Sequence, residues 1–99
     1  MNLQDVILAS PTIDGDLVLY AERIAGQLLP SSEAVLLQLT EEENEMKTDE
    51  VAKRKCPGFR YCMEMFLIQE FMQDLDAGAK RMDADEKVER VIYYIENDA

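Results

Sequence analysis

The order of hydrophobic and polar positions predicts both helices and strands. Apolar residues at helical spacing, Leu3, Val6 and Ile7, predict a short helix from Asn2 to Ala9 that stops at Ser10-Pro11. After a turn signal, LVLYAERI is rich in residues that favour strands, and we expect a strand over residues 16–24.

The apolar run EAVLLQL at residues 33–39 predicts a second strand. The loop before it is short, so the two strands most simply pair antiparallel. A lone hairpin is marginally stable in water, and we therefore expect a packed helix or a third short strand to support it.

The longest predicted helix runs from Phe59 to Ala77 and is ended by Gly78. Apolar side chains at steps of four and three residues form its core stripe: Tyr61, Met65, Ile68, Met72 and Leu75. Its first half is apolar on the other sides as well, so that end is expected to be buried on nearly all sides or to form an interface.

A final helix starts at Asp83-x-x-Glu86, which has the spacing of a capping box. Its apolar residues follow at i, i+3, i+4 and i+7: Val88, Val91, Ile92 and Ile95. The whole pattern predicts one α+β domain over residues 1–99. We expect a small antiparallel sheet of two or three strands, covered by two C-terminal helices, with a short N-terminal helix.

The most polar stretch, TEEENEMKTDE, covers residues 40–50, and its like charges favour a solvated loop or a frayed helical turn. Thr40-x-x-Glu43 matches a capping box formally, but no apolar periodicity follows it, so we do not expect the box to form. Thr48 is a better helix start, and that helix is expected to end before Pro57-Gly58.

The formal net charge is −11, from 21 acidic and 10 basic residues. Such a charge repels polyanions and anionic membranes, so we expect no direct binding to nucleic acid or membranes. The chain has neither a signal-peptide pattern nor an apolar run long enough to span a membrane, which favours the cytoplasm. The acidic stretch either is simply solvated or steers a basic protein partner, and its candidate contact residues are Glu41, Glu42, Glu43, Glu45, Asp49 and Glu50.

The residues that most often carry catalysis are scarce. No histidine is present, which excludes Ser-His and Cys-His nucleophile systems. Cys56 and Cys62 lack the spacing of a redox or zinc motif, and apolar neighbours raise the pKa of the Cys62 thiol, so structural cysteines are favoured over a redox pair or metal ligands. We therefore expect a non-enzymatic protein without cofactor or metal.

Glu64 is a charged residue close to the core stripe of the predicted long helix. A buried carboxylate needs a partner, and Arg60 at i−4 is the expected one, in a half-buried ion pair. The functional alternative for Glu64 is a polar anchor in a pocket or interface.

Strong acidity, the lack of histidine, and the stretches YCMEMFLIQEFMQDL and ERVIYYIENDA together resemble short uncharacterised bacterial domains, some of which are similar to immunity proteins of toxin systems. The resemblance spans the C-terminal half. It implies neutralisation of a toxin by occlusion of its basic active site or an exosite, and it transfers no site residue.

These observations predict a small acidic protein-binding module, most concretely an immunity-type inhibitor of a basic toxin, as a monomer or homodimer. Two alternatives stay open. One is a structural or regulatory subunit that oligomerises through the helix around residues 59–75. The other is an inhibitor that mimics nucleic acid, although the basic run Lys53-Arg54-Lys55 interrupts its acidic stripe.

Overall fold

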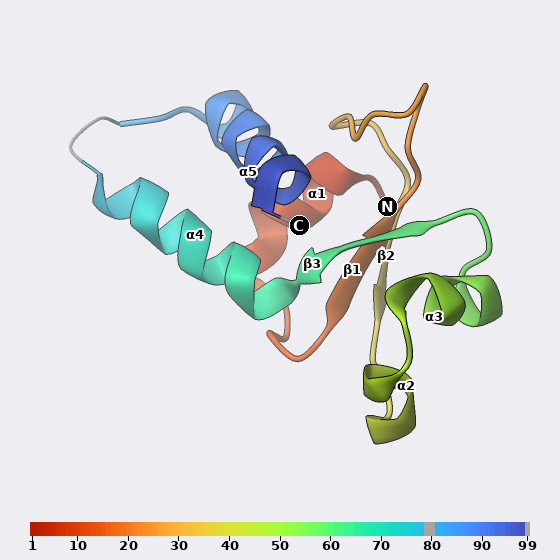
Figure 1. The fold of residues 1–99 in the computed structure, drawn as a ribbon. Helices are drawn as coiled ribbons and strands as arrows, with labels where there is room; N and C mark the ends of the chain where they lie inside the picture. The colour runs from red at the N-terminus through yellow and green to blue at the C-terminus, as the bar shows by residue number, and fades with distance from the viewer. Residues whose placement is uncertain (79–80, 99) are drawn as a thin grey trace.

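The computed structural model describes residues 1–78 and 81–98 (Figure 1). Its elements follow in this order: α1 (Leu3–Ala9), the 3₁₀ turn η1 (Ser10–Thr12), β1 (Val18–Ala21), β2 (Ala34–Leu37), α2 (Glu41–Glu45), α3 (Thr48–Lys55), β3 (Arg60–Glu64), α4 (Met65–Ala77) and α5 (Ala84–Asp98). The predicted α+β fold is confirmed, with a small antiparallel sheet, a short N-terminal helix and two C-terminal helices.

The sheet has three strands in the order β2-β1-β3, and both outer strands run antiparallel to β1. The predicted hairpin forms with Val18 opposite Leu37 and Ala21 opposite Ala34. The first strand is shorter than predicted because a turn precedes it, in which the Asp16 N–H donates to Asp14 Oδ1 at 2.9 Å. β3 is the third strand that we expected to support the hairpin.

The first part of the predicted long helix is a strand, and this prediction was wrong. β3 covers residues 60–64, and α4 begins at Met65 instead of Phe59. An apolar run with no polar side fits a strand covered on both faces as well as it fits a buried helix. Pairing with the open edge of β1 decides between them, because β3 forms its hydrogen-bonded ladder there.

A β-bulge interrupts the pairing between β1 and β3. Leu19 lies opposite Met63 and Tyr20 lies opposite Tyr61, which leaves Cys62 as the extra residue. The alternation of side chains shifts by one position at the bulge. Cys62 and Met63 therefore both enter the core on one face, whereas Tyr61 belongs to the core on the other face.

Helices α1, α4 and α5 cover one face of the sheet; α4 leads away from it and α5 returns toward it (Figure 1). Gln69 links α4 to the segment that follows α1, because its Nε2 donates to the carbonyl oxygens of Ser10 and Ile13. Phe71 of α4 stacks on Tyr94 of α5 with ring centroids 4.3 Å apart. The large, fully buried side chains of this core include Leu3, Ile7, Leu19, Met65, Ile68 and Ile95.

Helix α3 covers the opposite face, where Val51 and Cys56 pack in one cluster with Val18 and Tyr20. Because both faces are covered, every residue of β1 is buried. Both cysteines are free, and the sheet separates Cys56 from Cys62. Their places in separate clusters argue against a redox pair.

Side-chain caps start α1, where Asn2 Oδ1 accepts from the Asp5 N–H at 2.9 Å, and two further helices. The Glu86 N–H donates to Asp83 Oδ1 at 2.8 Å, as expected for the start of α5. Thr40 and Glu43 form a complete capping box at α2, which the sequence reasoning had dismissed. The box supplies hydrogen-bond acceptors to amide groups that a helix start leaves unpaired. Carboxylates in the first turn also interact favourably with the positive end of the helix dipole, so α2 forms without apolar periodicity.

Candidate functional site

A small pocket of about 80 Å³ lies where α2 and α3 meet the sheet. Its lining residues come from both strands of the bulged pair, the two short helices and the segments beside them: Val18, Tyr20, Leu39, Glu43, Asn44, Met46, Thr48, Val51, Tyr61 and Glu64. The pocket unites two candidates that lie apart in the sequence. The acidic stretch contributes Glu43, and β3 contributes Glu64.

The side chains of Tyr61 and Glu64 form a hydrogen bond in this pocket. The Tyr61 hydroxyl donates to Glu64 Oε2 at 2.6 Å, and both side chains are half-buried. Tyr20 meets the Tyr61 ring edge-on, with centroids 5.8 Å apart, and its hydroxyl donates to the Thr48 carbonyl oxygen at 3.4 Å. The pocket thus combines two phenol rings with a carboxylate held beside one of them.

Both phenols of the pocket are harder to ionise than an exposed tyrosine. Burial raises the pKa of Tyr61, and the hydrogen bond to Glu64 raises it further. Burial also raises the pKa of Tyr20, with added repulsion from nearby acidic groups that include Glu43 and Glu64. The two rings stay neutral at physiological pH. Tyr20 is fully buried, so the face of the half-buried Tyr61 ring is the one that can attract a cation.

Glu43 has a structural role as well as a place in the pocket. Its Oε1 accepts from the Thr40 N–H at 2.9 Å and pairs with Lys55 Nζ at 3.0 Å. The Thr40 hydrogen bond, followed by that from Lys55, lowers the pKa of Glu43. The side chain therefore stays ionised and links α2 to the end of α3.

The other candidate carboxylates of the acidic stretch are exposed on α2 and on the first turn of α3: Glu41, Glu42, Glu45, Asp49 and Glu50. Two residues, Met46 and Lys47, join the two helices. Two short helices thus occupy the stretch in which a solvated loop or a frayed helical turn was expected.

Arg60 does not pair with Glu64, and this prediction was wrong. Both residues lie in β3, where residues four apart are not neighbours as they are on a helix. Glu64 accepts from Tyr61 instead, and the exposed Arg60 lines a separate groove with Arg23. Tyr20 was not among the predicted site residues, because no local pattern connects it with the acidic stretch at residues 40–50.

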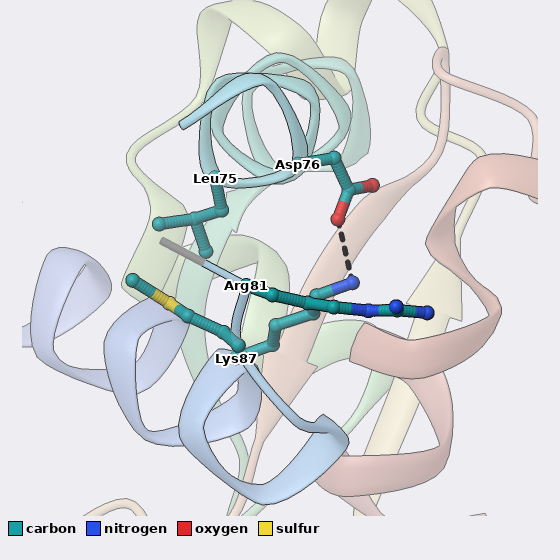
Figure 2. A pocket seen from close by; sticks show the side chains of 5 residues that line it. Leu75, Asp76, Arg81 and Lys87 are labelled. Atoms are coloured by element: carbon teal, nitrogen blue, oxygen red, sulfur yellow. Dashed lines mark ion pairs between the residues drawn. The ribbon is translucent and has the colours of Figure 1, made fainter. Parts of the chain in front are cut away.

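A further pocket, of about 340 Å³, lies between the end of α4 and the start of α5 (Figure 2). Lys87 Nζ and Asp76 Oδ1 form an ion pair there at 2.5 Å, and the Arg81 side chain extends past them (Figure 2). Leu75 and Met82 complete the lining. Asp76 thus compensates one of the two cations, Lys87 and Arg81, that line this pocket.

Residues 59–75, the alternative oligomer interface, are divided between β3 and α4. Cys62, Met63 and Met65 are buried within the chain itself, whereas Phe66 is 48% exposed. Packing within the chain itself therefore buries most of the apolar side chains that had suggested an oligomer interface in this segment.

Two further properties concern the described ranges 1–78 and 81–98. No three histidine, cysteine, aspartate or glutamate side chains are grouped there in a way that would hold a metal ion. None of the helices in these ranges has the length and apolar character needed to cross a membrane.

The comparisons with known proteins give one family match. No curated protein and no solved structure matches the chain significantly. A family model described as a domain of unknown function (DUF7716) matches residues 1–99. Since this match covers the entire sequence, the chain belongs to the DUF7716 family.

Proposed function

We propose that the protein is a non-enzymatic binding module that holds a basic partner protein at the pocket of Tyr20, Tyr61 and Glu64. The pair formed by Tyr61 and Glu64 carries this proposal, because it places a half-buried carboxylate beside a neutral, half-buried phenol ring. An ammonium or guanidinium group entering such a pocket gains a charge-assisted hydrogen bond and a cation–π contact together.

The size of the pocket supports a single side chain as its occupant. Its volume is about 80 Å³, whereas sites for small molecules usually enclose roughly 300–1,000 Å³. The end of one lysine or arginine side chain fits this space. The rest of the partner then lies over the surface around the pocket.

That surrounding surface has the composition of a protein interface. Half-buried apolar side chains flank the pocket on the α3 face of the sheet, among them Leu37, Leu39 and Met46. The exposed carboxylates of α2 and α3 supply charge outside this apolar centre. An apolar centre with a polar rim is the usual anatomy of such contacts, and the charges accelerate encounter with a basic partner by about 10–10³-fold at low salt.

In its most concrete form, the proposal is an immunity-type inhibitor that acts in the cytoplasm of a bacterium on a basic toxin. The acidic helices occlude the basic active site or an exosite of that toxin. The resemblance of the C-terminal half to short bacterial domains, some of which are similar to immunity proteins, supports this form, as does the acidic surface.

A titration with a lysine-rich peptide tests the pocket. We expect the backbone amide signals of Asn44, Met46 and Glu64 to shift in ¹⁵N NMR spectra. Glu64→Gln keeps an acceptor for Tyr61 but removes the charge, and it should weaken binding by roughly tenfold. Glu89→Gln, on the exposed surface of α5, is the matched control and should leave the affinity almost unchanged.

Equal weakening of peptide binding by Glu64→Gln and Glu89→Gln would show attraction to the net charge alone and would refute the pocket as the binding site.

The proposed immunity function has its own test. Co-expression with a basic toxin encoded by a neighbouring gene should restore growth, and reversal of Glu41, Glu42 and Glu45 to lysine should abolish that rescue. A salt-independent association rate with the toxin would contradict the steering role of the acidic helices.

A further inference from the structure

A groove of about 640 Å³ runs between α3 and the start of β3. Its lining is Arg23, Thr48, Asp49, Ala52, Lys53, Gly58, Phe59, Arg60 and Tyr61. An adjoining cavity of about 500 Å³ shares Arg23, Gly58 and Arg60 with it and adds Gly26. The two hollows thus meet around a pair of arginines.

The charge of this lining is opposite to that of the chain. Arg23, Lys53 and Arg60 are three cations against one carboxylate, Asp49, whereas the whole sequence has 10 basic and 21 acidic residues. The Asp49 carboxylate is already engaged locally, because its Oδ1 accepts from the Glu50 N–H at 3.0 Å. The groove is therefore a cationic region within an acidic surface.

The first arginine is held in a fixed position. Arg23 Nη1 donates to Glu96 Oε1 at 2.6 Å and to the Gly26 carbonyl oxygen at 3.3 Å. Both bonds use one nitrogen of a group that has five N–H donors. This arrangement orients the guanidinium before any ligand arrives, at the expense of part of its charge.

The other two cations retain their full charge. Within the described part of the chain, neither Arg60 nor Lys53 forms an ion pair. Arg60 is exposed at the first position of β3, directly after the turn at Gly58. A planar guanidinium in this position can bind two oxygens of a phosphate at once.

The backbone around the arginines is open to an approaching ligand. Gly26 and Gly58 have φ angles of 79° and 89°, and nothing lies within 4 Å of the position that a Cβ would occupy at either residue. Two aromatic side chains of the lining, Phe59 and Tyr61, are half-exposed. The groove therefore offers stacking surfaces next to its cations.

We propose that this groove binds a small molecule that carries a phosphate group on a flat aromatic body, of the size of a mononucleotide. Arg23 and Arg60 hold the phosphate, and the aromatic body stacks against Phe59. The volume lies in the range of roughly 300–1,000 Å³ that is usual for such ligands. A long nucleic acid is disfavoured because the net charge of −11 repels a polyanion outside the groove.

The test is an NMR titration of ¹⁵N-labelled protein with inorganic phosphate, adenosine and AMP in parallel. We expect phosphate and AMP to shift the amide signals of Gly26, Gly58 and Arg60. AMP should bind about tenfold more tightly than adenosine, because adenosine lacks the group that the arginines hold. AMP should also bind more tightly than phosphate, because phosphate lacks the ring.

Matched arginine variants decide whether the groove is the site. Arg60→Gln should weaken AMP binding by about tenfold or more, whereas Arg90→Gln removes the same charge from the exposed surface of α5 and should have little effect. Thermal unfolding of both variants checks that each is folded. AMP and the lysine-rich peptide are titrated separately, so that failure of the cation pocket and failure of this groove are distinguishable.

Three outcomes would overturn the inference. The first is the absence of shifts at the two glycines with AMP. The second is equal weakening by Arg60→Gln and Arg90→Gln, which would indicate attraction to charge in general. The third is a short single-stranded oligonucleotide that binds far more tightly than AMP, which would assign the groove to nucleic acid.

Discussion

Tyr61 and Glu64 share one face of the sheet although they are three residues apart in β3, and the hydroxyl of one donates to the carboxylate of the other at 2.6 Å. In a regular strand, residues three apart point to opposite faces. The extra residue at Cys62 in the bulge removes this separation. A backbone irregularity therefore creates the central pair of the pocket.

Tyr61→Phe should lower the free energy of unfolding by about 1–3 kcal/mol, because it leaves a half-buried carboxylate without its donor. Urea unfolding at pH 7 measures this change. Tyr93→Phe is the control, since the Tyr93 side chain is 68% exposed, and it should change stability little. Equal effects of the two substitutions would show that the hydrogen bond contributes nothing specific.

The two buried serines should respond in opposite directions to replacement by alanine. Ser32 Oγ accepts from the Leu29 N–H at 2.9 Å, so Ser32→Ala should destabilise the fold by about 1–3 kcal/mol. Ser10 Oγ is fully buried and lacks a hydrogen-bond partner among the described residues. Ser10→Ala removes a desolvated hydroxyl and should be neutral or stabilising by roughly 1 kcal/mol. Chemical denaturation of both variants checks the sign, and a large loss with Ser10→Ala would contradict this account.

Thr40→Ala should destabilise α2 locally by about 0.5–2 kcal/mol, because it breaks the capping box. Amide hydrogen exchange at Asn44, whose N–H donates to the Thr40 carbonyl at 2.9 Å, reports this opening. Thr48→Ala is a suitable control, since Lys47 is the N-cap of α3 and the Thr48 side chain does not cap that helix. Unchanged exchange in Thr40→Ala would mean that tertiary contacts alone hold α2.

Stability should fall in alkaline solution through the buried thiol of Cys62. Burial raises the pKa of this thiol from 9.0 to about 12. The folded state therefore keeps the proton that the unfolded chain loses. The resulting stabilisation is complete below pH 9 and is lost as the pH rises toward 12, at up to about 1.4 kcal/mol per pH unit.

Urea unfolding between pH 8 and pH 11 measures that slope in the wild type and in Cys62→Ala. The free energy of unfolding of the variant should fall less steeply with rising pH, regardless of how far the substitution destabilises the fold at pH 8. Tyr20 and Tyr61, whose pKa values are also raised, contribute the slope that remains. Parallel curves for wild type and variant would show that the thiol does not titrate in this way.

The fold class, the hairpin and the last helix were predictable because each rests on local signals. Apolar periodicity marked residues 88–95, and the side chain of Asp83 does cap α5. The boundary at residue 65 was not predictable in this way. Residues 61–63 are apolar on all sides, and only the free edge of β1, a long-range feature, selects a strand for them.

The candidate site was predictable in its acidic members but not in its two tyrosines or its arrangement. The acidic stretch and Glu64 were singled out by their chemistry, yet the partner of Glu64 was assigned as Arg60 on helical spacing. The correct partner, Tyr61, depends on a bulge that has no local signature around Cys62. Similarly, Arg23 and Arg60 meet only because β1 and β3 are neighbours in the sheet.

The strand order has a consequence for how the protein is made on the ribosome. β1 lies between β2, its hairpin partner and the next strand in the chain, and β3, which comes from the second half of the chain. Helices α4 and α5, which cover one face, are synthesised later still. The nascent hairpin therefore emerges with the edge of β1 bare until β3 is synthesised and with one apolar face incompletely covered until α4 and α5 follow, and during that interval it is the segment that a chaperone would have to shield.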